Sequence, residues 1–355
     1  MKKKILHLNI DLAITSGITR YIHLLAKNLS DDFEHHVISF ISCEDKKYDF
    51  EDSIIVYELS SAFFPRKLIM PFYVWRYISK HQIDIVHSHH RYFDLTAAII
   101  SKFIRVKTIM TVHSKVDGKK MLSYHASTIV AVSKCISDHL ENYYGVDRER
   151  IKIINNFIDF DTIKLSISRE DARASLGVQQ NEILIGYIGR LDFREKGIDI
   201  LLEAFDLLKK DFHNIRLILV GDGRNVKQVK KMNEKRNLQI LIKEPEPRIF
   251  DLFQALDLFV LPSKVDPFPY VMMEAAALKI PIVASNVDGI PEFIDHKVNG
   301  LLFEKNNIGD LISKIESMLT NESLRNELSE RLYMKVIDKY GKEKILPYYS
   351  NLYNG

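Results

Sequence analysis

Short apolar runs rich in β-branched residues alternate with longer stretches of helical periodicity, and this alternation starts twice along the chain. The first series of runs covers residues 5–8, 36–40, 54–57, 84–87, 108–113, 128–132 and 151–154. The second covers residues 183–188, 215–220, 240–242, 258–261, 282–284 and 300–303. Runs that are apolar throughout are typical of parallel strands covered on both faces by helices. The sequence therefore predicts two doubly wound α/β folds in tandem.

The point where the pattern restarts also predicts the domain organisation. A length of 355 residues suits two domains of ordinary size. We predict an N-terminal Rossmann-like domain over residues 1–160 and a C-terminal one over residues 161–335, with the polar stretch 159–182 as the linker. The residues from 332 to 353 have helical character, and Pro347 is expected to interrupt that helix.

Composition excludes several classes of protein. The chain has 50 Lys and Arg against 47 Asp and Glu, a net charge of +3, and a nucleic-acid-binding protein is usually more basic. Cys43 and Cys135 are too few and too far apart for a disulfide framework or a cysteine zinc site. No apolar run approaches the roughly 18 residues of a membrane span, and the N-terminus lacks a signal-peptide pattern. We expect a soluble, cytoplasmic protein.

The segment 59–120 is unusually basic, with 11 Lys and Arg against three Asp. It also contains Phe63, Phe64, Phe72, Tyr73 and the single tryptophan, Trp75. Basic residues mixed with aromatic ones suit an anionic membrane surface or a phosphate-bearing acceptor. A solvated charged face over ordinary core aromatics is an equally simple interpretation.

The first set of candidate functional residues follows the run 183–188. Gly189–Gly197 separates a predicted strand from a predicted helix, which places Arg190 and Lys196 at the carboxyl edge of a sheet, where α/β proteins bind ligands. The planar donor fork of Arg190 and the point charge of Lys196 suit a diphosphate. Either residue alone would more simply be a solvated loop charge.

A second set lies in the segment 261–278, where Asp266 and Glu274 are eight positions apart. Carboxylates in such positions can accept hydrogen bonds from sugar or ribose hydroxyls. The alternative is that Asp266 caps the following helix and Glu274 is a surface residue. Glu274, however, lies in an apolar stretch, where a buried carboxylate without a partner would be costly.

The N-terminal half offers weaker candidates. Gly17 lies in the turn between the first predicted strand and helix, where backbone N–H groups can approach a phosphate. His113 ends a predicted strand, so it also faces a carboxyl edge. His87 and His89 share one face of a strand, but no carboxylate or cysteine nearby completes a metal site, so we expect no metal there.

Taken in order, these motifs resemble those of the GT4-type retaining glycosyltransferases of the GT-B fold, and the resemblance covers nearly the whole chain. The most specific part is Asp266–Ala275 with Pro281–Ser285, Gly289–Glu292 and Asn299–Leu302. The other parts are the glycine loop of Gly17 and Arg20, Asp84–His89, Thr111–Ser114, Ala131–Ser133, Asn156–Asp159, Gly189–Leu191 with Lys196 and Gly197, and Gly221–Gly223.

The resemblance implies two Rossmann-like domains that face each other across a cleft, with the segment 336–355 returning toward the N-terminal domain. It implies that Arg190 and Lys196 neutralise the diphosphate of a UDP- or GDP-sugar donor, with the Gly17 backbone close to it. Glu274 would hold the ribose, whereas Asp266 and the backbone around Phe268 would hold the donor sugar, which His113 would face. Pro267 and Pro269 have no N–H group, so the amides of Phe268 and Tyr270 are the available backbone donors.

Three departures from the family pattern are visible. Asp266 stands where the family has a glutamate, Ser16 where a second glycine is frequent, and Phe157 where a glycine often follows the asparagine. The shorter Asp266 side chain changes the expected contacts to the donor sugar.

The implied activity is retaining, metal-independent hexosyl transfer from a nucleotide sugar to a hydroxyl of a glycan or lipid-linked acceptor, in bacterial cell-envelope polysaccharide synthesis. It requires no cofactor beyond the donor substrate, and it suits a protein at the cytoplasmic face of the membrane. Two alternatives stay open: a nucleotide-sugar epimerase or hydrolase on the same fold, and a non-catalytic partner subunit. A dehydrogenase is disfavoured because no G-x-G-x-x-G follows the first predicted strand.

Overall fold

The chain folds into two compact α/β units. The computed structural model describes residues 2–13, 16–41, 50–51, 53–58, 66–246 and 248–355. Unit 1 comprises Met1–Asn156 with Ile345–Gly355, and unit 2 comprises Phe157–Lys344. The division therefore falls four residues before the boundary placed at residue 160 from the sequence.

Unit 1 is built on a parallel sheet whose strand order is β3-β2-β1-β4-β5-β6-β7 within the described residues. Its strands are β1 (Lys3–Asp11), β2 (Phe33–Ile41), β3 (Ile55–Glu58), β4 (Ile85–Ser88), β5 (Lys107–Val112), β6 (Thr128–Ala131) and β7 (Ile151–Ile153). Its helices are α1 (Gly17–Asn28), α2 (Arg66–His81), α3 (Arg91–Ile100), α4 (Lys134–Asn142) and, from Ile345 on, α13 (Lys342–Asn354).

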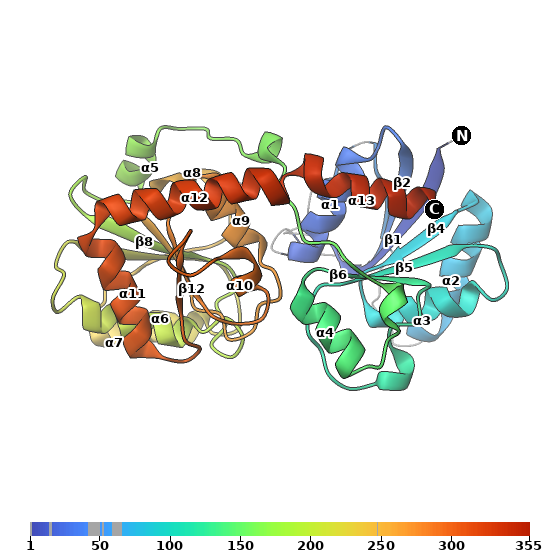
Figure 1. Ribbon diagram of the computed structural model, residues 1–355, viewed down its shortest axis with the longest axis horizontal. Coiled ribbons are helices and arrows are strands. Elements are labelled where there is room, and N and C mark those ends of the chain that lie inside the picture. Colours follow the sequence, from blue (N-terminus) through green and yellow to red (C-terminus); the bar gives the residue numbers. More distant parts are fainter. Residues whose placement is uncertain (1, 14–15, 42–49, 52, 59–65, 247) are drawn as a thin grey trace. The chain divides into compact units, whose positions relative to one another are not determined.

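The two faces of the unit 1 sheet differ in chemistry because side chains alternate along each strand. Helices α2 and α3 cover one face, which is apolar and includes Leu6 and Leu8 of β1 (Figure 1). On the opposite face of β1 lies His7, whose ring contacts His87, which in turn bonds Tyr353 of the C-terminal helix α13. Helices α1 and α13 cover this face of the sheet (Figure 1). The buried face under α13 is therefore unusually polar.

Unit 2 has a second parallel sheet, of order β10-β9-β8-β11-β12-β13 in the part of the chain that the structure describes. Its strands are β8 (Ile183–Ile188), β9 (Ile215–Val220), β10 (Leu241–Lys243), β11 (Leu258–Leu261), β12 (Ile282–Ser285) and β13 (Leu301–Phe303). Its helices are α5 (Arg169–Ser175), α6 (Ile198–Leu208), α7 (Val226–Arg236), α8 (Ile249–Ala255), α9 (Tyr270–Ala277), α10 (Ile290–Phe293), α11 (Ile308–Thr320) and α12 (Glu322–Tyr340).

Both sheets confirm the predicted doubly wound architecture, and every run predicted as a strand overlaps one. Helices cover both faces of the unit 2 sheet, with α6, α7 and α11 on one face and α5, α8, α9 and α12 on the other (Figure 1). Among the described residues, no helix is long and apolar enough to cross a membrane.

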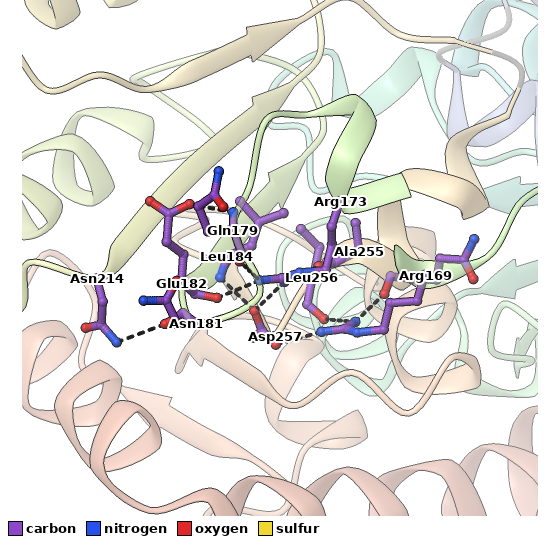
Figure 2. A network of polar contacts seen from close by, with 11 residues as sticks. Arg169, Arg173, Gln179, Asn181, Glu182, Leu184, Asn214, Ala255, Leu256 and Asp257 are labelled. Carbon is purple, nitrogen blue, oxygen red and sulfur yellow. Dashed lines mark hydrogen bonds and ion pairs between the residues drawn. The ribbon is translucent and has the colours of Figure 1, made fainter. Parts of the chain in front are cut away.

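The stretch 159–182, predicted as a linker, instead includes the packed helix α5. Arg173 of α5 is buried and donates hydrogen bonds to Asp257 and to the carbonyls of Ala255, Gln179 and Glu182 (Figure 2). Ser168 caps the helix by accepting from the Asp171 N–H. The Ser168-x-x-Asp171 pattern, a helix-start signature, is the sequence signal that reveals α5.

The expected interruption at Pro347 is also corrected. Helix α13 continues through Pro347, and the break between α12 and α13 falls at Gly341. The backbone of Gly341 is extended there (φ −64°, ψ 153°) and forms a β-bridge with Ile158. Backbone pairing within unit 2 ends α12, so the proline does not decide where the helix stops.

Candidate functional site

The predicted site residues of unit 2 gather where the chain connections diverge. Strands β8 and β11 are neighbours in the sheet, but β8 connects through α6 to β9 on one side and β11 connects through α9 to β12 on the other. Such a topological switch point, at the carboxyl ends of the strands, is where open α/β sheets bind ligands. Arg190 and Lys196 lie on the loop after β8, and Asp266 lies on the loop after β11.

The loop after β8 approaches the loops after β9 and β11 so closely that glycine is required at the contacts. Gly197 has φ +63°, and a Cβ there would lie 2.1 Å from the Pro262 carbonyl oxygen. A Cβ on Gly221, after β9, would lie 1.8 Å from the Gly189 carbonyl oxygen. Backbone atoms cannot yield as a flexible side chain can, so these glycines fix the course of the loop after β8.

Arg190 is held loosely. Its guanidinium donates to Glu195, with 2.6 Å between Nη2 and Oε2, and the two side chains are 53% and 44% exposed. An exposed pair of this kind contributes at most about 1 kcal/mol to stability. A more highly charged anion can therefore replace Glu195 as the partner of Arg190 with little loss of stability.

Lys196 is held more firmly, by the second site carboxylate. Its Nζ lies 2.6 Å from Asp266 Oδ2, and the side chains are 21% and 7% exposed. The same carboxylate oxygen accepts from the Ser263 hydroxyl at 3.0 Å, and the Asp266 N–H donates to Asp288 at 2.9 Å. The structure thus joins two residues that the sequence placed 70 positions apart.

Asp192, which the sequence analysis did not single out, stabilises the loop between Arg190 and Lys196. It accepts from the Glu195 N–H at 2.8 Å and forms an ion pair with Arg224. Burial acts to raise the pKa of Asp192, but these partners together hold it below its ordinary value. A buried aspartate two positions after Arg190, at a strand-to-helix loop, is the pattern that could have identified this role.

The alternatives considered for Asp266 and Glu274 are wrong. Pro269, not Asp266, is the N-cap of α9, and Glu274 is only 2% exposed. Phe268 packs its ring against Phe293 and Tyr340, at centroid distances of 5.9 and 5.5 Å. Its side chain is therefore part of the core.

Tyr270, the other residue predicted to offer an amide, is the first residue of α9 and is buried. Backbone N–H groups at a helix start point away from the helix body.

In unit 1, Gly17 follows β1 and His113 follows β5, two strands that are separated by β4 in the sheet. Gly17 is the first residue of α1, after β1, with Ser16 as its N-cap. His113 comes directly after β5, is half-buried, and lies with its Nε2 3.1 Å from Nδ1 of His89. Burial lowers the pKa of His113 to about 3, so the ring is neutral at pH 7. A neutral imidazole serves as a hydrogen-bond partner without contributing a charge.

The histidines considered for a metal site lie deep in unit 1. His87 is fully buried and bonds Tyr353 and Thr111, at 2.8 and 2.7 Å. In the described part of the chain, His7, His87 and His89 bring one ligand nitrogen each within 4.8 Å of one another. His7 was not singled out from the sequence because it stands 80 residues from His87 and meets it only through β1–β4 pairing.

A cavity of about 730 Å³ in unit 2 lies beside α5 and Asp257, and none of the predicted site residues lines it. The side chains that could recognise an anion there are already engaged. Arg169 bonds Asp257 at 2.6 Å and the Leu256 carbonyl at 2.9 Å, while Arg173 is buried in the network described above (Figure 2). This region therefore stabilises unit 2 and offers no unengaged cation from Arg169 or Arg173.

Comparison with known proteins matches both units. The family model "Glycosyl transferases group 1" matches residues 168–335, and the model "Glycosyltransferase Family 4" matches residues 15–162. The chain is 26% identical to an uncharacterized glycosyltransferase, MJ1178, from Methanocaldococcus jannaschii over 92% of this chain and 91% of that protein. It is 22% identical to the capsular polysaccharide biosynthesis glycosyltransferase CapM of Staphylococcus aureus over 66% of this chain and 63% of that protein.

Among solved structures, the Anabaena protein Alr3699/HepE in complex with UDP and glucose has the same fold. The TM-score is 0.84 at 21% identity, over 99% of this chain and 100% of that one.

Proposed function

The chain belongs to the group 1 glycosyltransferases of the GT4 type with the GT-B fold, and from that premise we propose that it transfers a hexose from a nucleoside-diphosphate sugar to a hydroxyl acceptor with retention at the anomeric carbon. The donor is a UDP- or GDP-sugar. The structure solved with UDP and glucose supports a nucleotide sugar as donor, since that protein shares this fold.

One observation carries the proposal: two cations lie on the loop after β8, at the switch point of unit 2, within a backbone that close glycine contacts hold in place. Arg190 and Lys196 each already face a carboxylate, at 2.6 Å. A diphosphate would replace Glu195 as the partner of the exposed Arg190. Lys196 would add its charge from beside Asp266.

The cations act on the leaving group. As the bond from the anomeric carbon to the diphosphate breaks, negative charge grows on the phosphate oxygens. Preorganised cations therefore stabilise the transition state more than they stabilise the ground state. The acceptor hydroxyl attacks on the same face, and the leaving phosphate oxygen takes its proton. This scheme needs no divalent metal.

The remaining site residues bind and orient the donor. In unit 2, Glu274 accepts hydrogen bonds from the ribose hydroxyls, and Asp266 with the backbone amides of Phe268 and Tyr270 holds the sugar. In unit 1, the Gly17 backbone approaches the diphosphate and His113 contacts the transferred sugar.

The acceptor that we propose is a glycan or lipid-linked saccharide of a cell-envelope polysaccharide. The similarity to a capsular polysaccharide glycosyltransferase supports this class. Unit 1 would dock on an anionic membrane surface through its basic, aromatic segment 59–120.

Within that segment, α2 exposes Phe72, Tyr73 and Trp75 (56%, 45% and 42%), and the Phe72 and Trp75 rings lie 5.8 Å apart. Exposed aromatic side chains next to cations such as Arg76 are typical of interfacial helices. Phe63 and Phe64 lie outside the described residues.

A two-stage assay tests the proposal. Thermal shift with a panel of UDP- and GDP-sugars identifies the donor, and proton NMR of the product made with a hydroxyl acceptor determines the anomeric configuration. We expect one donor class to stabilise the protein and the product to keep the donor configuration. Free or epimerised sugar formed from donor alone would support the epimerase or hydrolase alternative. The absence of binding by any donor would support a non-catalytic subunit.

A further inference from the structure

Four histidines of unit 1 form a continuous hydrogen-bonded row, which we call the histidine array: His113, His89, His7 and His35. The nitrogen-to-nitrogen distances between successive rings are 3.1, 3.1 and 3.0 Å. Each bond joins Nε2 of one ring to Nδ1 of the next, in that order. The array is therefore connected head to tail from the half-buried His113 to the fully buried His35.

The sheet topology builds this array. His35 lies on β2, His7 on β1, His89 directly after β4 and His113 directly after β5, and these strands are consecutive in the sheet. The rings of His7 and His35 are stacked, as are those of His7 and His89, with interplanar angles of 19° and 17°. The row thus crosses the sheet from the β2 side to the position of the predicted site residue on β5.

The protonation of the array is constrained by its geometry. Burial lowers the pKa of all four histidines, so at neutral pH each ring has one N–H donor and one acceptor nitrogen. Each bond needs one donor and one acceptor, and every bond runs from Nε2 to Nδ1. All four rings must then carry the proton on the same nitrogen, so the tautomer of His113 depends on that of His35.

The buried end of the array has no further partner. Nδ1 of His35 is engaged by His7, and within the described residues its other ring nitrogen, Nε2, meets no hydrogen-bond partner. Burial lowers the pKa of His35 to about 4, so this ring stays neutral at pH 7 and holds a single proton on one of its two nitrogens.

We propose that the histidine array ties the tautomer of His113 to that of His35, so that Nδ1 of His113, which the array does not use, meets a hydroxyl of the bound sugar in one fixed hydrogen-bonding role. His89, His7 and His35 are positioning residues that act through His113. The role toward sugar rests on the proposed function, whereas the shared tautomer rests on the geometry of unit 1 alone.

A metal site built from His7, His87 and His89 is the competing use of these rings. Their nitrogens lie close enough for one ion. However, both nitrogens of His7 and of His89 are engaged in the array, and both of His87 bond hydroxyls. A metal would have to break these bonds without gaining an anionic ligand in the group.

Nitrogen NMR of the full chain labelled with ¹⁵N-histidine tests the tautomers directly, without donor or acceptor. Two-bond proton–nitrogen correlations distinguish N–H from lone-pair nitrogens, and single substitutions assign the rings. We expect all four histidines to carry the proton on the same ring nitrogen, unchanged from pH 6 to 8. Opposite tautomers within the array, or a shift of His7 and His89 on adding equimolar Zn²⁺, would overturn the proposal.

Substitution at the far end tests the coupling. His35→Leu removes the hydrogen-bond partner of His7, and we expect the His113 signals to show mixed tautomers, whereas His35→Asn, whose amide can donate or accept, preserves the parent tautomer. His87→Gln is the matched control, since His87 packs beside the array but makes none of its bonds. An unchanged His113 tautomer in folded His35→Leu would contradict the coupling. If His35→Leu does not fold, the tautomers measured in the parent protein test the proposal.

Activity supplies the second readout. With the donor identified, we expect His35→Leu to reduce kcat about tenfold with KM for the donor changed less, and His35→Asn to restore most of it. A loss of kcat in His87→Gln equal to that in His35→Leu would indicate a merely structural effect. It would overturn the role of the array in positioning His113 toward the sugar. A parent protein without transferase activity refutes the proposed function, yet leaves the tautomer measurement valid.

Discussion

Arg190→Ala separates the chemistry of the site from the stability of the fold. Within the described part of the chain, the Arg190 side chain forms one ion pair, with Glu195, and both groups are about half exposed. Removing an exposed pair costs at most about 1 kcal/mol of unfolding free energy. If Arg190 neutralises the leaving diphosphate, its loss should reduce kcat roughly 100- to 1000-fold. That reduction corresponds to about 2.7 to 4 kcal/mol of transition-state stabilisation.

Lys196→Ala also removes a cation from the diphosphate site, but it tests the chemistry less directly because it changes stability as well. The Asp266 side chain is 7% exposed and would lose its cation. Breaking one partner of a buried pair costs on the order of 3 kcal/mol, so part of any lost activity would reflect unfolding. Arg190→Lys keeps the charge without the donor fork, and we expect only partial activity.

The assay combines steady-state transfer kinetics with urea unfolding for each variant. Arg236→Ala is the matched control, because Arg236 on α7 forms a similarly exposed pair with Asp206, at 3.1 Å with side chains 40% and 33% exposed. We expect Arg236→Ala to match the parent in both measurements. A folded Arg190→Ala enzyme with parent-like kcat would refute the assignment of Arg190 to the diphosphate.

Four further outcomes follow from the structure. Arg173→Ala should lower the unfolding free energy by about 3 kcal/mol, because it removes four hydrogen bonds of a buried guanidinium, although Asp257 keeps those from Arg169 and from the Leu184 N–H; a loss below 1 kcal/mol in urea unfolding would contradict this. Glu274→Gln should raise the donor KM at least as much as it lowers kcat, and an unchanged KM would argue against a ribose contact. The unfolding free energy of unit 1 should fall as pH decreases from 6.5, because histidines of the unfolded chain bind protons that the same histidines do not bind while buried in the folded state. His35, with a folded-state pKa of about 4, alone accounts for a loss of about 2 kcal/mol at pH 5. Trp75, the single tryptophan and part of unit 1, reports this transition by fluorescence, and a midpoint independent of pH would refute it. The chain should co-sediment with anionic vesicles at low salt and less at high salt, each cation contributing about 1 kcal/mol; equal binding to neutral vesicles would exclude the membrane proposal.

The sequence predicts the strands well because their apolar runs are continuous, a pattern that parallel sheets impose on both faces. It also places Arg190, Lys196 and Asp266 on loops at strand ends, since the carboxyl edge follows from strand–helix order. Helix α5 and the break at Gly341 escape prediction for different reasons. The first depends on a short capping pattern in a charged stretch, and the second depends on a backbone bridge to Ile158.

Side-chain partners are the part that the sequence does not contain. The Lys196–Asp266 pair and the histidine array join residues far apart in the chain, and their contacts depend on strand order and register. In the sequence, nothing distinguishes His7 and His35 from other residues of apolar strands. They meet His89 only because β2, β1 and β4 are neighbours.

Calorimetric titration of UDP and GDP into the parent protein and into Arg190→Ala tests the central claim most directly. The account predicts that at least one of the two nucleotides binds the parent in the presence of a metal chelator, and that Arg190→Ala weakens this binding at least tenfold while Arg236→Ala leaves it unchanged. Binding of neither nucleotide by the folded parent, or equal binding by parent and Arg190→Ala, would contradict a nucleoside-diphosphate site at the switch point of unit 2.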